Sequence, residues 1–208
     1  MFAFEKALVY HCSPTLSGLK PANLLSLSKR DYPHLPELAE EYSLLLSSKG
    51  IQLEIVCSCG QRWLLLVFRP QMLAEQLADR RAFALLRQAS YPVLADRPLD
   101  LAALLSHLKK RLSQSEAFPH EIGLFLGYPL EDVIGFCRHK GEGCKLCGYW
   151  KVYGDVESAR KSFALFDRCR ELLFPTCCPA LRCRSWSASS LWPHKDTRFI
   201  DSIRRFFL

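Results

Sequence analysis

Residues 51–68, IQLEIVCSCGQRWLLLVF, decide the fold class of this chain. Apolar and polar side chains alternate over residues 51–58, which predicts a strand with one buried face. Residues 63–68 are apolar throughout, which favours a central strand covered on both faces. Gly60 lies in the short turn between the two runs. The stretch therefore predicts a β-hairpin.

Helical patterns lie on both sides of this hairpin. Pro36, followed by acidic residues, predicts a helix that ends at Gly50. Residues 70–89 have a helical composition with a break near Asp79, and the leucines of residues 101–112 follow the spacing of one buried helix face. Residues 119–139 predict two helices separated by a turn at Gly127, and residues 156–173 predict one more helix.

Together these elements predict an α+β fold. We expect a small mixed sheet in which a strand near residues 15–20 and another at 149–153 join the central hairpin, with helices mostly on one face. Residues 1–174 are expected to form a single domain. Residues 175–208 are expected to form an irregular C-terminal tail, because they lack periodicity and contain Pro175, Pro179 and Pro193.

The charge of the chain is unevenly distributed. The 208 residues carry a formal net charge of +7, with 14 basic and 14 acidic residues in 1–137 but 14 basic and 7 acidic residues in 138–208. A basic segment attracts phosphate, but solvated lysines and arginines on helix faces explain it more simply. The second helix of residues 119–139 also begins with Glu131 and Asp132, which disfavours its insertion into DNA. Nucleic-acid binding is therefore not favoured.

The sequence predicts a cytoplasmic protein with no membrane association. Its first residues lack a basic segment followed by a continuous apolar run, and residues 63–68 are far shorter than the roughly 18–20 apolar residues of a membrane-spanning helix. Ten cysteines in a reducing compartment are expected to be thiols or metal ligands rather than a disulfide framework. Some of them are expected to be small core side chains.

Three short motifs suggest chemistry. His11 and Cys12 place a base beside a thiol, but neighbouring side chains diverge on a helix or a strand, so each would need a distant partner. The pair Cys144 and Cys147 has the spacing of a zinc or iron knuckle or of a redox pair. His120 begins a pattern typical of zinc proteases, but Leu124 stands where the second histidine is required. Common nucleotide-binding and hydrolase motifs are absent from the sequence.

Three motifs occur in order along the chain: HCSPTLSGLKPAN at residues 11–23, FPHEIGLFLGYP at 118–129 and CGYWKVYGD at 147–155. Together they resemble an uncharacterised bacterial domain family that is found mainly in anaerobes. The resemblance covers about residues 7–173 and implies a shared site. It also implies a setting in iron uptake and electron transfer, with a flavodoxin-like protein as a redox partner. Members keep a cysteine matching Cys147 more regularly than one matching Cys144, which weakens the metal knuckle.

Polar residues of mixed type within these otherwise apolar motifs favour a ligand site. We therefore interpret the protein as a small-ligand, metal or redox accessory protein with one site shared by the three motifs. The alternatives are an enzyme that uses Cys12 or Cys147 as a nucleophile, and a protein-interaction module without chemistry. The candidate ligand-binding residues are His11, Cys12, Lys20, Asn23, His120, Glu121, Cys147 and Lys151, and the candidate ligands for iron or zinc are Cys144 and Cys147.

Overall fold

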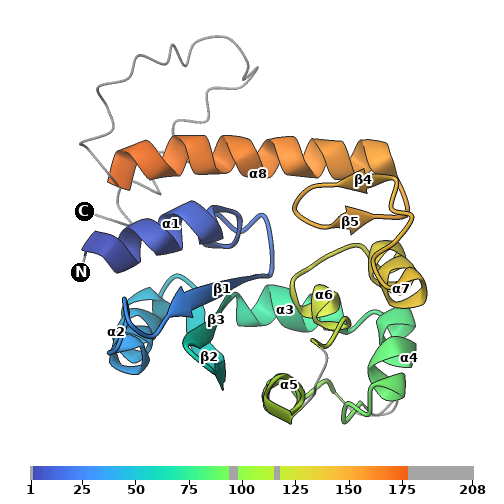
Figure 1. The fold of residues 1–208 in the computed structure, drawn as a ribbon, viewed down its shortest axis with the longest axis horizontal. Helices are drawn as coiled ribbons and strands as arrows, with labels where there is room; N and C mark the ends of the chain where they lie inside the picture. Colours follow the sequence, from blue (N-terminus) through green and yellow to red (C-terminus); the bar gives the residue numbers. More distant parts are fainter. Residues whose placement is uncertain (1, 94–97, 115–117, 178–208) are drawn as a thin grey trace.

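A computed structural model describes residues 2–93, 98–114 and 118–177 of the chain (Figure 1). It combines helices with two small antiparallel sheets, so the predicted α+β class is confirmed. None of the helices in these three ranges is long and apolar enough to cross a membrane.

The larger sheet contains β1 (Ala22–Ser28), β2 (Gln52–Cys59) and β3 (Arg62–Phe68) in the order β1-β3-β2, with antiparallel pairing throughout. The predicted hairpin is β2–β3, and Gly60 adopts a φ of +52° in its turn. The prediction of a strand near residues 15–20 is wrong. Helix α1 (Phe2–Leu16) ends there, Gly18 turns the chain at a φ of +73°, and β1 begins only after Pro21, which lacks a backbone N–H.

Helices cover both faces of this sheet, where we expected them mostly on one. Leu65 and Val67 of β3 pack toward α1 and α2 (Leu35–Ser47). The alternating Leu66 and Phe68 pack toward α3 (Pro70–Leu77), α5 (Leu101–Gln114) and α6 (Ile122–Phe125). The apolar run in β3 requires this double cover, because successive side chains of a strand point to opposite faces.

The expected strand at residues 149–153 does not join the central sheet. The two residues Lys151 and Val152 form β5, which pairs with β4 (Leu146–Cys147) in a separate two-stranded sheet. Trp150 and Val152 are buried against Ala159 and Phe166 of α8 (Val156–Cys177). The aromatic and branched residues that suggested a strand therefore serve mainly to pack this hairpin under α8.

Helix α8 spans the length of the molecule, with α1 beside its C-terminal half and the β4–β5 hairpin beneath its N-terminal half (Figure 1). It continues to Cys177, three residues past the expected domain boundary at Phe174. The rest of the predicted tail lies outside the described residues.

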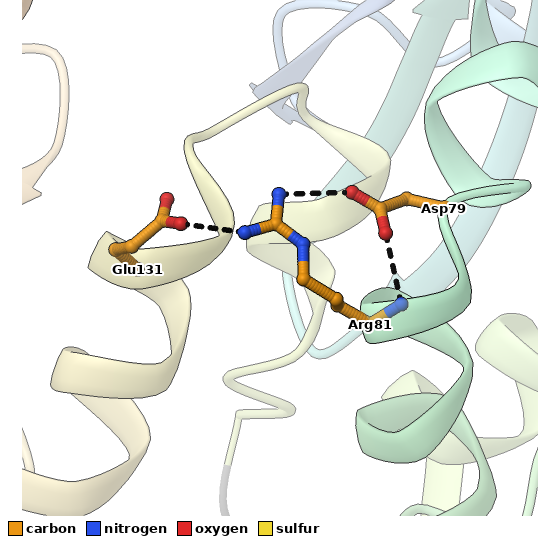
Figure 2. Close-up of polar contacts among 3 residues, drawn as sticks. All are labelled: Asp79, Arg81 and Glu131. Atoms are coloured by element: carbon orange, nitrogen blue, oxygen red, sulfur yellow. Dashed lines mark hydrogen bonds and ion pairs between the residues drawn. The ribbon is translucent and has the colours of Figure 1, made fainter.

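The predicted break near Asp79 and the predicted pair of helices within residues 119–139 are both confirmed. Asp79 caps α4 (Arg80–Gln88) by accepting a hydrogen bond from the backbone N–H of Arg81. The guanidinium of Arg81 then bridges Asp79 and Glu131, which lies in the first turn of α7 (Leu130–His139) (Figure 2). This exposed bridge connects α4 to the second helix of the α6–α7 pair.

Candidate functional site

A cavity of about 220 Å³ lies where all three sequence motifs meet. The first motif contributes residues from α1 and β1, the second contributes the turn between α6 and α7, and the third contributes the β4–β5 turn. Helix α8 closes the remaining side. The lining residues are Tyr10, His11, Pro14, Lys20, Asn23, Leu24, Leu126, Tyr128, Tyr149 and Arg170.

The segment between α1 and β1 is held in place by hydrogen bonds at the end of α1. Arg69 donates to the carbonyl oxygens of Thr15 and Leu16, both at 2.7 Å, and so satisfies acceptors that a helix end leaves open. The hydroxyl of Thr15 donates to Oδ1 of Asn23 at 2.7 Å. These contacts fix Lys20, which lies between the two anchored ends.

The second motif approaches this segment very closely at Gly127. This glycine has a φ of +70°, and a Cβ atom there would lie 2.4 Å from the ring of Pro21. Any larger residue would push the α6–α7 turn away from the α1–β1 segment. The turn therefore brings Tyr128 over Lys20, with the Lys20 Nζ 4.9 Å from the centre of the tyrosine ring.

Basic side chains dominate the electrostatics of the cavity. Lys20, His11 and Arg170 line it, and no aspartate or glutamate is among the described lining residues. Lys20 is only 4% exposed, and burial lowers its pKa to about 8 although nearby Cys12 acts in the opposite direction. Burial, and then the charge of Arg170, also lower the pKa of His11. The cavity thus favours a ligand that brings negative charge.

Arg170 occupies the wall that α8 contributes. It donates a hydrogen bond to Asp167 at 2.5 Å, and its guanidinium lies 5.2 Å from the ring centre of Tyr10 and 6.0 Å from that of Tyr149. The Tyr149 hydroxyl donates to the same carboxylate at 2.8 Å. Burial and this hydrogen bond raise the Tyr149 pKa to about 12, so the phenol stays neutral in the physiological range.

Four of the predicted ligand-binding residues lie at or behind this cavity. His11, Lys20 and Asn23 line it, and Cys12 is fully buried and interacts electrostatically with Lys20. Burial raises the pKa of the Cys12 thiol well above its usual range. A thiol that stays protonated is a poor nucleophile, so its environment does not favour the cysteine-enzyme alternative at this residue.

The other four predicted ligand-binding residues do not line the cavity. The ring centres of His120 and Phe136 are 4.9 Å apart, and the Lys151 Nζ lies 5.9 Å from the centre of the same Phe136 ring. Lys151 also donates to the Gly141 carbonyl at 2.7 Å. Glu121 is buried in an ion pair with Arg111. Cys147 is exposed in β4. The motifs converge, but through partly different residues from those predicted.

The candidate metal ligands Cys144 and Cys147 lie in and just before the β4–β5 hairpin as free thiols. Within residues 2–93, 98–114 and 118–177, no group of three or more cysteine, histidine or acidic side chains is placed to hold a metal ion. The two thiols therefore lack the further described ligands that a tetrahedral zinc or iron site requires.

A second hollow, of about 510 Å³, lies between α2, β2 and α5. Its lining includes Glu54 and Lys109, which neutralise each other in an ion pair of 2.5 Å. None of its lining residues belongs to the three motifs. This comparison favours the smaller basic cavity as the candidate site.

Sequence reasoning missed several lining residues of the cavity. Tyr128 and Tyr149 lie within the quoted motifs but were not singled out, and Tyr10 directly precedes the first motif. Arg170 lies four residues after Phe166, one of the apolar residues on the buried side of α8. A basic residue at that spacing from a buried aromatic residue was the available signal for Arg170.

The fold is α+β, and basic side chains are among those that line its small cavity. The chain belongs to the family described as a protein of unknown function, DUF3793, which matches residues 8–182. This match includes all three motifs and confirms the resemblance to an uncharacterised family. No curated protein and no solved structure matches the chain significantly.

Proposed function

We propose that this protein binds a small anionic molecule in the cavity between α1, β1, the α6–α7 turn and α8. The observation that carries the proposal is the charge of Lys20: this side chain lines the cavity, and no aspartate or glutamate is among the described lining residues. Arg170 also lines the cavity, where one of its nitrogens pairs with Asp167. A nearly buried ammonium group without a paired carboxylate is costly to a folded protein. Such a group is typical of a site that receives its counter-charge from a ligand.

The size and shape of the cavity limit the ligand. A volume of about 220 Å³ is below the roughly 300–1,000 Å³ of pockets for drug-sized molecules. Pro14, Leu24 and Leu126 supply apolar wall, and Asn23 supplies an amide, so the site suits a compact acid with a short carbon skeleton. Nucleotides and extended peptides are too large to be enclosed.

A metal or redox accessory role is a second candidate function, separate from anion binding in the cavity. It is supported by the iron and electron-transfer setting that the family resemblance implies, and by the exposed thiol of Cys147 near Cys144. Iron and zinc content and the absorption spectrum of protein purified without oxygen test it. A binding measurement with a reduced flavodoxin tests whether a flavodoxin-like protein is a redox partner. Protein that contains no metal, has no visible absorption and does not bind flavodoxin would reject the metal or redox role and leave only anion binding.

Ligand-dependent thermal stability tests anion binding. The probes are acetate, lactate and inorganic phosphate, each added to the wild type and to the variants Lys20→Met and Lys29→Met. Lys29 is a matched control, because its Nζ lies 4.8 Å from the ring centre of Trp63 but outside the cavity. A ligand at 100 times its Kd stabilises a protein by about 2.7 kcal/mol.

We expect at least one of these anions to raise the melting temperature of the wild type and of Lys29→Met, but not that of Lys20→Met. Equal shifts in all three proteins would indicate a general salt effect. Either that result or the absence of any shift would reject the proposal.

A further inference from the structure

Lys20 is the one buried lysine among the residues that the structure describes. Lys145 and Lys151 donate to backbone carbonyl oxygens, and Lys109 pairs with Glu54. The amine of Lys20 lies over the ring of Tyr128 and opens on the cavity, and no described carboxylate lies within ion-pair distance of it. Its nitrogen is therefore available to a ligand that enters the cavity.

Arg170 and Lys20 offer two different functions to such a ligand. The guanidinium of Arg170 donates from one nitrogen to Asp167, and its planar fork keeps further N–H donors that suit a second carboxylate. The amine of Lys20 is a nucleophile when it has lost its proton. Because both side chains line the same small cavity, a short ligand that contacts Arg170 lies close to Lys20.

We propose that the ligand is a small 2-oxo acid, whose carboxylate is held by Arg170 and whose carbonyl carbon forms an imine with the Nζ of Lys20. This inference rests on the proposed anion-binding function and names the ligand class of that site. A 2-oxo acid fits because its carboxylate and its carbonyl are on adjacent carbon atoms. A carboxylate without a carbonyl group would bind at the same place without forming a bond.

The reaction balances without an oxidant or a reductant. The lone pair of the Lys20 nitrogen forms the new bond to the carbonyl carbon, and the electron pair of the C=O bond moves to oxygen, which takes a proton. The nitrogen loses its proton, the carbinolamine loses its hydroxyl group as water, and a C=N bond forms. One amine and one carbonyl compound give one imine and one water molecule.

The surroundings of Lys20 support this chemistry. Burial lowers its pKa to about 8, so a useful fraction of the amine is neutral near physiological pH. The titratable groups around it are Cys12 behind it and His11, Tyr128, Tyr149 and Arg170 in the cavity lining. His11 also lines the cavity, and burial lowers its pKa, which favours the neutral form of its imidazole.

Borohydride trapping tests the proposal. Wild-type protein is incubated with pyruvate, reduced with sodium borohydride, digested and analysed by mass spectrometry. We expect an adduct on the peptide containing Lys20, with the mass of pyruvate less one water and plus two hydrogens. It should form at least tenfold faster than any adduct on Lys29 and be absent at that site in Lys20→Arg. Arg170→Gln should slow trapping of pyruvate more than trapping of acetone, which has no carboxylate.

Lactate separates this inference from the proposed function, because it is shaped like pyruvate but has no carbonyl carbon to trap. If both acids raise the melting temperature and pyruvate gives no adduct on Lys20, the imine is wrong and anion binding stands. If acetate, lactate, phosphate and pyruvate all leave the melting temperature unchanged and no adduct forms, both proposals fail. Adducts spread evenly over the surface lysines would also overturn the imine.

Discussion

Asp132 is the polar residue that holds the third motif against α7, and its replacement gives a sharp test of the structure. The side chain is 3% exposed and accepts hydrogen bonds from the indole N–H of Trp150 at 2.6 Å and from the backbone N–H groups of Tyr153 and Gly154, both at 2.7 Å. In Asp132→Asn, one oxygen can still accept the two backbone bonds. The new amide group, however, meets the indole N–H as a second donor.

The magnitude follows from that conflict. A hydrogen bond to a charged group contributes about 1.5–3 kcal/mol, and a buried donor without an acceptor costs about 1–3 kcal/mol. We therefore expect Asp132→Asn to lower the free energy of unfolding by about 3 kcal/mol. Trp150→Phe removes the opposing donor, so the double variant should be more stable than the sum of the single changes predicts, by about 1.5–3 kcal/mol.

Urea denaturation followed by far-ultraviolet circular dichroism measures all four proteins, since a tryptophan signal would change with the substitution. Glu131→Gln is the matched control. It changes the neighbouring residue of α7, whose carboxylate is exposed in the bridge of Figure 2, and it should leave the denaturation midpoint almost unchanged. Strictly additive effects of the Asp132 and Trp150 changes would show that the Asp132 carboxylate and the Trp150 indole N–H are not coupled by a hydrogen bond.

Three further predictions concern the charge of Lys20, the paired thiols and the domain boundary. Folding lowers the pKa of Lys20 from 10.5 to about 8, so below pH 8 the folded state bears the cost of a buried ammonium, and that cost disappears as pH rises to 10.5. Lys20→Met should thus be more stable than the wild type at pH 7 by about 3 kcal/mol, and the difference should shrink toward pH 10.5. Urea denaturation across this pH range measures the difference, and a difference that stays constant with pH would contradict the lowered pKa of Lys20. For the thiols, Cys144→Ser should leave stability and ligand binding nearly unchanged, whereas Cys147→Ser should abolish thiol reactivity with the fold intact. Alkylation rate, metal content and melting temperature measure these effects. Equal, severe losses in both variants would instead indicate a metal knuckle, because bound metal contributes about 10–16 kcal/mol to folding in small zinc modules. We also propose that residues 1–174 form the folded domain, so that removing residues 175–208 should cost little stability. A large drop in melting temperature on this truncation would show that the boundary is wrong.

The parts of the fold that the sequence predicted well depend on local periodicity. The β2–β3 hairpin and the α5 leucines repeat at the spacing of their own element, so each pattern reports burial directly. The error at residues 15–20 has a local cause as well. Pro14 lies inside α1, and a proline there obscures a helix that neighbouring packing nevertheless stabilises. The prediction that residues 149–153 join the central sheet is wrong because their aromatic residues indicate burial, which here is burial under α8. Burial alone does not say which strand pairs with which.

The candidate site was only partly predictable for a different reason. His11, Lys20 and Asn23 were chosen because these polar residues interrupt apolar sequence, and all three line one cavity, although their role in ligand binding stays a prediction. Arg170 joins them through the packing of α8 beside α1, a contact between residues far apart in the chain. The orientation of Glu121 toward Arg111 likewise depends on tertiary packing. The spacing from Phe166 places Arg170 on the buried side of α8, but no local pattern says which element that side meets or which residue Glu121 pairs with.

The ammonium signal of Lys20 tests directly whether the cavity between α1, β1, the α6–α7 turn and α8 binds an anion. In protein labelled with ¹⁵N-lysine, the Lys20 Nζ resonance can be followed by NMR as a function of pH, without and with saturating lactate. The account predicts a midpoint near pH 8 in the free protein, because burial opposes the charge, and an upward shift with lactate, because a bound anion stabilises the ammonium. A midpoint like that of an exposed lysine, or one that lactate does not move, would contradict the assignment of this cavity as an anion site.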